Sequence, residues 1–600
     1  MLGHVKTQKK TITFNAFICF IVIAATIFRF VLLWYFSWDV RNWPHDDLLQ
    51  RNNAISILNG NWLGDYSNVI LPKYPGFPLF LAFINRLFIP YSIGIGLIMT
   101  LSSFSFCMAI SPLVKKKCDG KTEGGSDKLQ TLFLAGLYLG ILYVPIPYMA
   151  MSRIYRNVLA PWLVLLIFSG ICGMYTRTDR LIKILPWSMI TACSLALFSI
   201  LREDYIWIYI PVFVAGGVIF SCQLKNSRNV LRTIILLIMI AFPIVFAVGV
   251  QKTIALINYH IYGVQLLSDR TEGYFAEMMG KLYSIRPVEE EPDSLWVSRK
   301  SINRAQESSP TLAKLDIEEA INMWTGSNTR EMYGDMISWA IRDAISAKGY
   351  FKDAQNTQSF LRSICNELKE SFKNDYLSER EGFQISSSMR NVTFNEVFDV
   401  MWFALKNDLC FLRYPQCTVD ISKMFVDDPH DIREEDVLEW EKLLNIKLPR
   451  SDVQLDTIAA GESIREENAI RKRYIRYSAK IQNSILLFYQ ALSTPIIILA
   501  VIGFVFQTYQ WIIYHKRHIK ETKNGKILLI IVALFLSIIL ESITILLFSR
   551  FMVGDVVGAS WSAYYLSSIY PLQLICELLG IYLLAETVLG IASKRKFFCF

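Results

Sequence analysis

Ten apolar runs, each about 18 residues or longer, constrain the fold of this chain more than any other feature of its sequence. A helix of about 20 residues is long enough to cross the hydrocarbon core of a membrane, which is about 30 Å thick. The runs extend approximately over 14–35, 91–114, 130–149, 158–175, 184–201, 205–222, 233–250, 485–513, 527–548 and 566–591. We therefore expect an all-α polytopic membrane protein with about ten transmembrane helices.

The charged residues divide the chain into two different parts. Hydrophobic residues make up 53% of the 600 residues, and the net charge is +9. Residues 256–482 contain 29 basic and 37 acidic residues, which leaves +17 for the apolar remainder. There the basic residues form short runs between apolar spans, and this excludes the continuous basic face of a nucleic-acid-binding protein. We predict an N-terminal membrane domain (1–255, about seven helices), a separate domain (256–482) and a C-terminal membrane domain (483–600, about three helices).

Basic residues also predict the orientation of the membrane helices. If the N-terminal lysines are cytoplasmic, every second loop is basic, as the Lys/Arg bias of cytoplasmic loops requires. These loops contain the basic runs within 115–117, 177–183, 225–232, 516–520 and 594–596. The sequence thus predicts a multi-pass protein of the cell membrane with both termini cytoplasmic. The first outer loop (38–90) and the 256–482 domain are expected on the extracytoplasmic side.

The extracytoplasmic domain is predicted to be mainly helical. Its segments 336–347 and 358–372 place apolar residues three and four positions apart, and Gly349 and Lys373 follow them as helix-ending residues. Strand-like alternation is scarce. A disulfide between Cys410 and Cys417 stays open from the sequence, with bridged and unbridged states about equally favoured.

The first outer loop is too polar to cross the bilayer and too apolar to be a free loop. Apolar residues form one face over 46–58 and again over 77–88, so we expect two short helices in the plane of the membrane interface. This loop places Asp46, Asp47 and Lys73 at the outer membrane surface.

Several of these residues carry a resemblance to a known family. Its motifs in this sequence are His45-Asp46-Asp47, the run Lys73-Tyr74-Pro75-Gly76-Phe77-Pro78, Ser549-Arg550-Phe551 and the segment 564–572, and Arg29 near the outer end of the first span also fits. The chain resembles the polytopic glycosyltransferases of the GT-C superfamily, which includes the protein O-mannosyltransferases and the aminoarabinose transferase of lipid A. The resemblance covers residues 14–250 and 485 onward, and it leaves out the extracytoplasmic domain.

The resemblance implies an enzyme that moves a sugar from a polyprenyl-phosphate donor to a hydroxyl of a glycan, lipid or protein acceptor. Such a reaction needs a base for the acceptor hydroxyl. Consecutive helical residues diverge by about 100°, so Asp46 and Asp47 are not expected to face one pocket from one helix. We prefer Asp47 as the catalytic residue, with Asp46 at the helix start. No cofactor or metal ligand is predicted, and a role for a divalent cation stays open.

Cations for the departing phosphate are the second requirement of this chemistry. The predicted phosphate-binding residues, all at outer ends of spans, are Lys73, Arg153, Arg156, Arg202 and Arg550. Arg153 and Arg156 share a face if their segment is helical. Ordinary interfacial placement of long basic side chains is the alternative. For Arg202, the alternative is a salt-bridged turn with Glu203 and Asp204.

Two other functions stay open at this point. Glu541, Glu577 and Glu586 lie inside apolar spans, where carboxylates are costly and mark transport pathways. A transporter or lipid-carrier flippase is therefore the main alternative. A non-catalytic sensor with a ligand-binding outer domain is the third.

Overall fold

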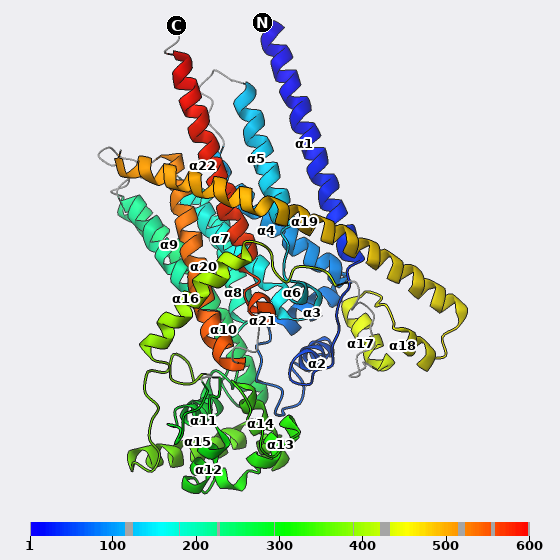
Figure 1. Cartoon of the computed structure of the whole chain (residues 1–600), viewed down its shortest axis with the longest axis vertical. Coiled ribbons are helices and arrows are strands. Elements are labelled where there is room, and N and C mark those ends of the chain that lie inside the picture. Colours follow the sequence, from blue (N-terminus) through cyan, green and yellow to red (C-terminus); the bar gives the residue numbers. More distant parts are fainter. Residues whose placement is uncertain are drawn as a thin grey trace.

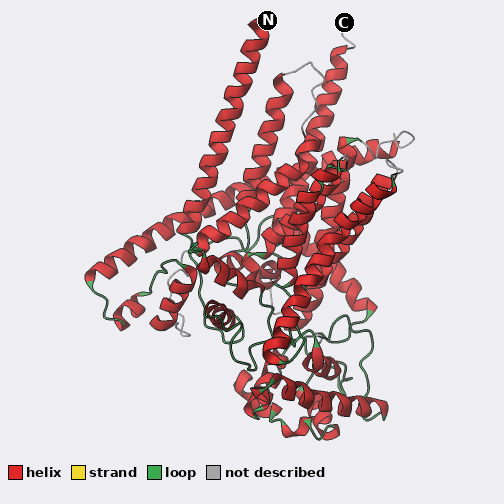
Figure 2. Cartoon of the chain, turned by 180° about the vertical axis from the view of Figure 1, so that it is seen from behind, coloured by secondary structure: helices red, strands yellow, loops and turns green. Residues whose placement is uncertain are grey.

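The computed structural model describes residues 2–114, 124–178, 180–224, 229–292, 294–387, 389–420, 433–513, 522–553 and 559–597. Within these ranges the regular secondary structure consists of helices (Figure 2), and β-pairing is limited to isolated bridges. Among the described residues, eight helices are long and apolar enough to cross a membrane. The chain is therefore an all-helical, multi-pass membrane protein, as its sequence predicts.

The eight helices coincide with eight of the ten predicted spans. They are α1 (Leu2–Trp34), α4 (Tyr91–Val114), α7 (Ala160–Thr176), α8 (Leu185–Ser199), α10 (Val230–Tyr262), α19 (Glu462–Ile513), α20 (Lys523–Val553) and α22 (Ile569–Phe597). The other two predicted spans contain shorter apolar stretches, Lys128–Leu142 within α5 (Gly124–Leu142) and Ile206–Cys222 within α9 (Ile206–Leu224). The predicted run 130–149 is divided, because Pro145 and Pro147 follow the end of α5 and a new short helix, α6 (Tyr148–Ser152), begins after them.

Small residues let neighbouring membrane helices approach closely. A Cβ atom built on Gly173 of α7 would lie 2.0 Å from the ring of Trp187 at the start of α8. A Cβ atom on Gly503 of α19 would lie 2.1 Å from the carbonyl oxygen of Gly580 in α22, which α19 crosses obliquely in Figure 1. Side chains at these two positions would force the helices apart, so glycine sets both separations.

Both termini lie at one end of the helix bundle, and a helical domain lies at the other end (Figure 1). This domain contains α11 (Gly273–Tyr283), α12 (Arg299–Ser308), α13 (Ile317–Thr325), α14 (Met336–Ala347) and α15 (Ala354–Lys373). The sequence-based predictions of α14 and α15 are confirmed. Asp353 caps α15 by accepting from the backbone N–H groups of Gln355 and Asn356, and Leu361, Ile364 and Leu368 are buried along one face.

The rest of the predicted extracytoplasmic region returns to the membrane helices. There α16 (Phe394–Phe411) packs against α20, and α17 (Glu434–Leu444), which precedes α18 (Asp452–Thr457), packs against the first outer loop. The predicted domain boundaries at 255/256 and 482/483 fall inside α10 and α19. Those helices therefore continue from the membrane part into the outer part without a break.

The first outer loop forms the two expected helices, α2 (Asp47–Leu58) and α3 (Gly76–Arg86). The N–H of Gly76 donates to the carbonyl oxygen of Ile200 at 2.8 Å, just after α8. A Cβ atom on Gly76 would lie 2.5 Å from that oxygen. The absence of a side chain thus lets the start of α3 dock directly on the end of α8.

The two cysteines considered for a disulfide are not bridged. Cys410 is an exposed thiol on α16, and Cys417 is a buried thiol with its Sγ atom 3.4 Å from the carbonyl oxygen of Pro415. Both are free thiols in this structure.

Candidate functional site

Asp46 lies immediately before α2 and is contacted by three polar groups, one from Lys73 and two from the segment that contains Arg153 and Tyr155. Its Oδ1 atom is 3.0 Å from Nζ of Lys73 and accepts a hydrogen bond from the hydroxyl of Tyr155 at 3.0 Å. Its Oδ2 atom accepts from Nη2 of Arg153 at 3.2 Å. Burial would raise the pKa of Asp46, but Lys73 and Arg153 outweigh burial and hold that pKa well below its usual range. The side chain, still 30% exposed, is therefore an ionised carboxylate open to a ligand.

Asp47 is more enclosed than Asp46. Its Oδ1 and Oδ2 atoms accept from Nε and Nη2 of Arg153 at 2.8 and 2.5 Å, and its side chain is 1% exposed. Burial raises the pKa of Asp47, and the two hydrogen bonds from Arg153 oppose that rise. This geometry is a bidentate, buried ion pair in which both carboxylate oxygens are occupied.

The expectation that Asp46 and Asp47 face different directions is wrong. Both carboxylates bind the guanidinium of Arg153. The reason is that α2 begins at Asp47, while Asp46 has non-helical backbone angles (φ −128°, ψ −91°) and forms no side-chain cap. The helical divergence of consecutive residues does not apply across a helix start.

Lys73 comes from the loop between α2 and α3 and is buried, with 6% of its surface exposed. Besides Asp46, its ammonium group lies 5.3 Å from the centre of the Trp339 ring in α14. Burial lowers the pKa of Lys73, and the charge of Asp46 opposes this. The only ion-pair partner described for this ammonium group is thus the carboxylate with an exposed side.

Arg153 and Arg156 do not share a helix face. Arg153 has an extended backbone after α6, and Arg156 begins the short 3₁₀ helix η1 (Arg156–Val158). Arg156 binds Glu203 at 2.5 Å instead of the aspartates. Their guanidinium groups lie 4.5 and 5.3 Å from the ring centre of Tyr155, so this one ring contacts both cations.

Of the predicted salt-bridged turn, the pair between Arg202 and Asp204 is present, whereas Glu203 pairs with Arg156 outside the turn. Nε and Nη2 of Arg202 donate to Asp204 at 2.8 and 2.7 Å, and Nη1 donates to the carbonyl oxygen of Tyr565 at 3.3 Å. Arg202 therefore contacts the segment before α22. The predicted phosphate-binding residue Arg550 lies in α20, and its side chain falls outside the described residues.

The outer domain adds residues that the sequence analysis missed. Arg270 pairs with Asp335, and its guanidinium lies 4.9 Å from the centre of the Trp339 ring. His45 stacks between the rings of Trp324 and Trp339, with centroid separations of 5.0 and 4.7 Å. These contacts place α13 and α14 directly against the first outer loop. No signal in the sequence distinguishes Arg270 from the other basic residues of the acidic region.

Together these side chains form a compact group, which we call the charged cluster. Its cations are Lys73, Arg153, Arg156, Arg202 and Arg270, and its carboxylates are Asp46, Asp47, Glu203, Asp204 and Asp335. Each cation has a carboxylate partner, so an incoming phosphate has to exchange with a carboxylate. Among the described residues no group of three or more His, Cys, Asp or Glu side chains is arranged to hold a metal ion.

No protein-family model matches this chain, and no curated protein or solved structure matches it either. The resemblance noted in the sequence therefore stays a prediction. Any function has to be argued from the charged cluster and its position in the fold.

Proposed function

We propose that this protein is an integral membrane glycosyltransferase with about ten transmembrane helices and a GT-C-like architecture. It transfers a sugar from a polyprenyl-phosphate donor to an acceptor hydroxyl at the outer face of the membrane. The observation that carries the proposal is the position of Asp46, a partly exposed carboxylate in contact with the cations Lys73 and Arg153. A base beside cations is what glycosyl transfer from a lipid phosphate requires.

The charged cluster supports a specific division of roles. Asp46 takes the proton of the acceptor hydroxyl while that oxygen forms a bond to the anomeric carbon of the sugar. The bond from this carbon to the phosphate oxygen breaks, and the lipid phosphate leaves with the added negative charge. Lys73 stabilises this charge. Its ion-pair partner Asp46 becomes neutral when it takes the proton, so the ammonium group of Lys73 can then bind the phosphate.

Asp46 suits the base better than Asp47, which the sequence favoured. Both oxygens of Asp47 are occupied by Arg153 and the group is closed to a ligand, whereas Asp46 has an exposed side. Asp47 is then a positioning residue, which fixes the guanidinium of Arg153 beside Asp46. Movement of Lys73 from Asp46 to the donor phosphate also raises the basicity of Asp46, since Lys73 contributes to its low pKa.

The arrangement of the chain supports placing this chemistry outside the cytoplasm. The termini lie at one end of the bundle and α11 to α15 at the other (Figure 1), and the sequence puts basic loops on the side of the termini. We therefore assign both termini to the cytoplasm and the charged cluster to the outer face. A lipid carrier is needed there, because it delivers the sugar across the membrane.

The test is transfer from a synthetic polyprenyl-phosphate sugar by the purified full-length protein in nanodiscs. Mass analysis of surface glycans from cells with and without the protein identifies the acceptor. Asp46→Asn should lose transfer, and Asp65→Asn, an exposed aspartate of the same loop, should not. Full transfer by both Asp46→Asn and Asp47→Asn would end the proposed mechanism.

A transporter is the second candidate because a carboxylate is buried among the membrane helices. Glu541 of α20 is 1% exposed, accepts a hydrogen bond from Ser568, and has an Oε2 atom without a partner. A transporter predicts that Glu541→Gln abolishes function while Asp46→Asn is tolerated. The glycosyltransferase predicts the reverse, so the same two variants separate the candidates.

A further inference from the structure

Arg29 of α1 lies apart from the charged cluster. Unlike the cations of that cluster, it has no carboxylate partner among the described residues. Its side chain is 7% exposed. Within the described part of the chain Arg29 forms no ion pair, and its buried Nε atom has no hydrogen-bond acceptor. Its guanidinium lies over the ring of Tyr143, 5.5 Å from the ring centre.

An unpaired guanidinium in this position is energetically unfavourable. Arg29 belongs to a helix with the length and composition of a membrane span, where a charge without a partner is costly. Elsewhere in the described chain, buried arginines such as Arg51, Arg153 and Arg342 are paired with carboxylates. The contrast indicates that the counter-ion of Arg29 is supplied by another molecule.

Arg29 lines a pocket between α1, the segment around α6, and α19. Its polar lining residues are Arg29, Gln482, Tyr143 and Tyr148. The remaining lining is mainly apolar and includes Phe36, Ile146, Met151, Ile485 and Leu486. A pocket with one cationic group and an otherwise mainly apolar lining is suited to an amphiphilic ligand with an anionic headgroup.

The helices that border this pocket also face the lipid. Phe28 and Val31 of α1 are 44% and 46% exposed, and Phe488 of α19 is 63% exposed. Apolar side chains exposed on membrane helices contact acyl chains. A lipid whose head enters the pocket can therefore keep its chains against α1 and α19.

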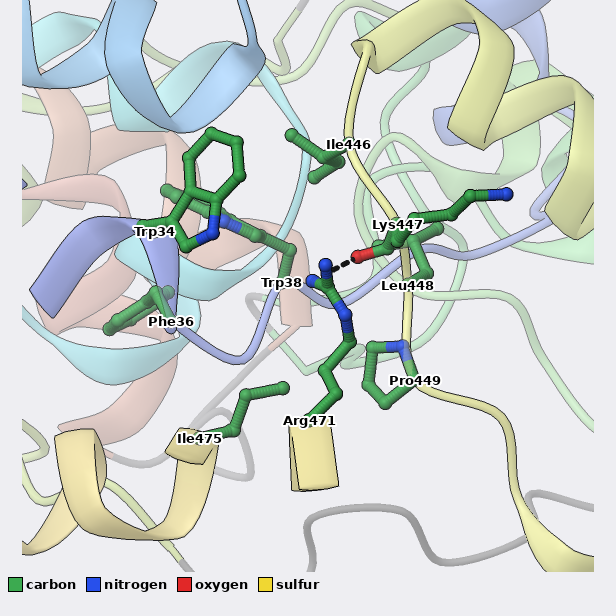
Figure 3. A pocket seen from close by; sticks show the side chains of 9 residues that line it. All are labelled: Trp34, Phe36, Trp38, Ile446, Lys447, Leu448, Pro449, Arg471 and Ile475. Atoms are coloured by element: carbon green, nitrogen blue, oxygen red, sulfur yellow. Dashed lines mark hydrogen bonds between the residues drawn. The ribbon is translucent and has the colours of Figure 1, made fainter. Parts of the chain in front are cut away.

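A neighbouring pocket provides the internal comparison. It shares Phe36 with the Arg29 pocket and is lined by Trp34, Trp38 and Arg471 (Figure 3). There Nη1 of Arg471 donates to the carbonyl oxygen of Lys447 at 2.7 Å, as the dashed line in Figure 3 marks. The guanidinium of Arg471 thus has an acceptor within the protein, whereas no acceptor is described for that of Arg29.

We propose that the Arg29 pocket binds the headgroup phosphate of an anionic phospholipid. The phosphate oxygens accept hydrogen bonds from the guanidinium, and the acyl chains lie along α1 and α19. No cation or carboxylate of the charged cluster lines this pocket, so the inference does not rest on the proposed glycosyltransferase function.

Native mass spectrometry of the delipidated full-length protein in detergent tests the proposal. The protein is titrated with phosphatidylglycerol, phosphatidylcholine or soluble glycerol 3-phosphate. We expect each wild-type molecule to retain one more molecule of phosphatidylglycerol than the Arg29→Gln variant does. The wild type should bind this lipid with an affinity about tenfold or more above that of the variant. Arg471→Gln is the matched control and should bind like the wild type. Phosphatidylcholine, which has no net charge, and glycerol 3-phosphate, which has no acyl chains, should bind more weakly.

Two further variants keep the result independent of misfolding. Arg29→Lys retains the charge and should restore binding, while Ile485→Trp fills the pocket without altering Arg29 and should abolish it. Equal binding of phosphatidylglycerol by the wild type and Arg29→Gln, or by the wild type and Ile485→Trp, would overturn the proposal. Equal affinity for phosphatidylcholine would overturn it as well. Equal affinity for glycerol 3-phosphate would replace the lipid with a soluble anion and so refute the lipid site.

Discussion

Asp47 binds Arg153 through both carboxylate oxygens, at 2.8 and 2.5 Å, and neither side chain is more than 2% exposed. Asp46 contacts the same guanidinium through a single oxygen, at 3.2 Å, and keeps an exposed side. Two adjacent aspartates thus differ in how much of each is available to a substrate.

This difference predicts opposite effects of the two asparagine substitutions. Asp46→Asn should lower the transfer rate on the order of 100-fold or more with little change in the midpoint of thermal unfolding. Asp47→Asn should lower that midpoint, because it removes the bidentate carboxylate partner of a buried guanidinium and leaves only the single contact with Asp46. Transfer assays and thermal unfolding on the same preparations separate the effects. A stable Asp47→Asn protein with no transfer, together with full transfer by Asp46→Asn, would return the base role to Asp47.

Lys73→Ala should weaken donor use and change the pH dependence of transfer. Lys73 contributes to the low pKa of Asp46, so its removal raises that pKa, and the rate then falls at a higher pH as the solution is acidified. The KM for the donor should also rise. Rate against pH for the wild type, Lys73→Ala and the exposed-lysine control Lys252→Ala checks this. An unchanged acid limb in Lys73→Ala would contradict the coupling.

The membrane helices were predictable because hydrocarbon imposes a length and a composition that the sequence displays directly. The same holds for α2, α3 and α14, whose apolar faces repeat at helical spacing. The sequence missed the end of α5, where two prolines shorten the predicted span.

The pairings in the charged cluster were not predictable, because they join segments far apart in the sequence. Lys73 and Arg153 converge on Asp46 only after α3, α6 and α8 pack together. Arg270 reaches the same place from the outer domain through its contact with Trp339. The spacing of residues along a chain carries no information on such contacts. It also led to the wrong expectation that the side chains of Asp46 and Asp47 point in different directions.

His45 should make the contact between the first outer loop and α14 sensitive to pH. Burial lowers the pKa of His45 below its ordinary value of 6.5, although the charges of Asp343 and Asp46 oppose the shift. The unfolded chain then binds a proton more readily than the folded chain, so stability decreases as the pH falls below about 6.5. His45→Phe keeps the stacking on Trp339 and should reduce the loss of unfolding midpoint between pH 7 and pH 5. Identical pH dependence in both proteins would refute this role.

The ion pair between Arg51 of α2 and Asp436 of α17, at 3.0 Å, should stabilise the docking of α17. Both side chains are under 10% exposed, so Arg51→Met leaves a buried carboxylate whose main partner is gone. We expect destabilisation of about 3 kcal/mol or more, measured by denaturant unfolding. The double variant Arg51→Met with Asp436→Leu should recover most of it. If the double variant is as unstable as the single one, packing rather than charge is responsible.

The proposed topology predicts which introduced cysteines react in intact cells. In a background without native cysteines, Ser308→Cys on α12 should react with a membrane-impermeant thiol reagent, and Lys117→Cys should react only after the membrane is permeabilised. Reaction at residue 117 but not at residue 308 in intact cells would invert the assignment.

The direct contact of Gly76 with the carbonyl oxygen of Ile200 holds the backbone around the charged cluster without using any charged side chain. It fixes the backbone near Lys73 against the backbone near Arg202 through neutral groups alone. Ions can therefore change partners at the cluster while the main chain keeps its register. A side chain at position 76, even a methyl group, would displace Lys73 without touching any charge, and such a variant would separate the geometry of the cluster from its electrostatics.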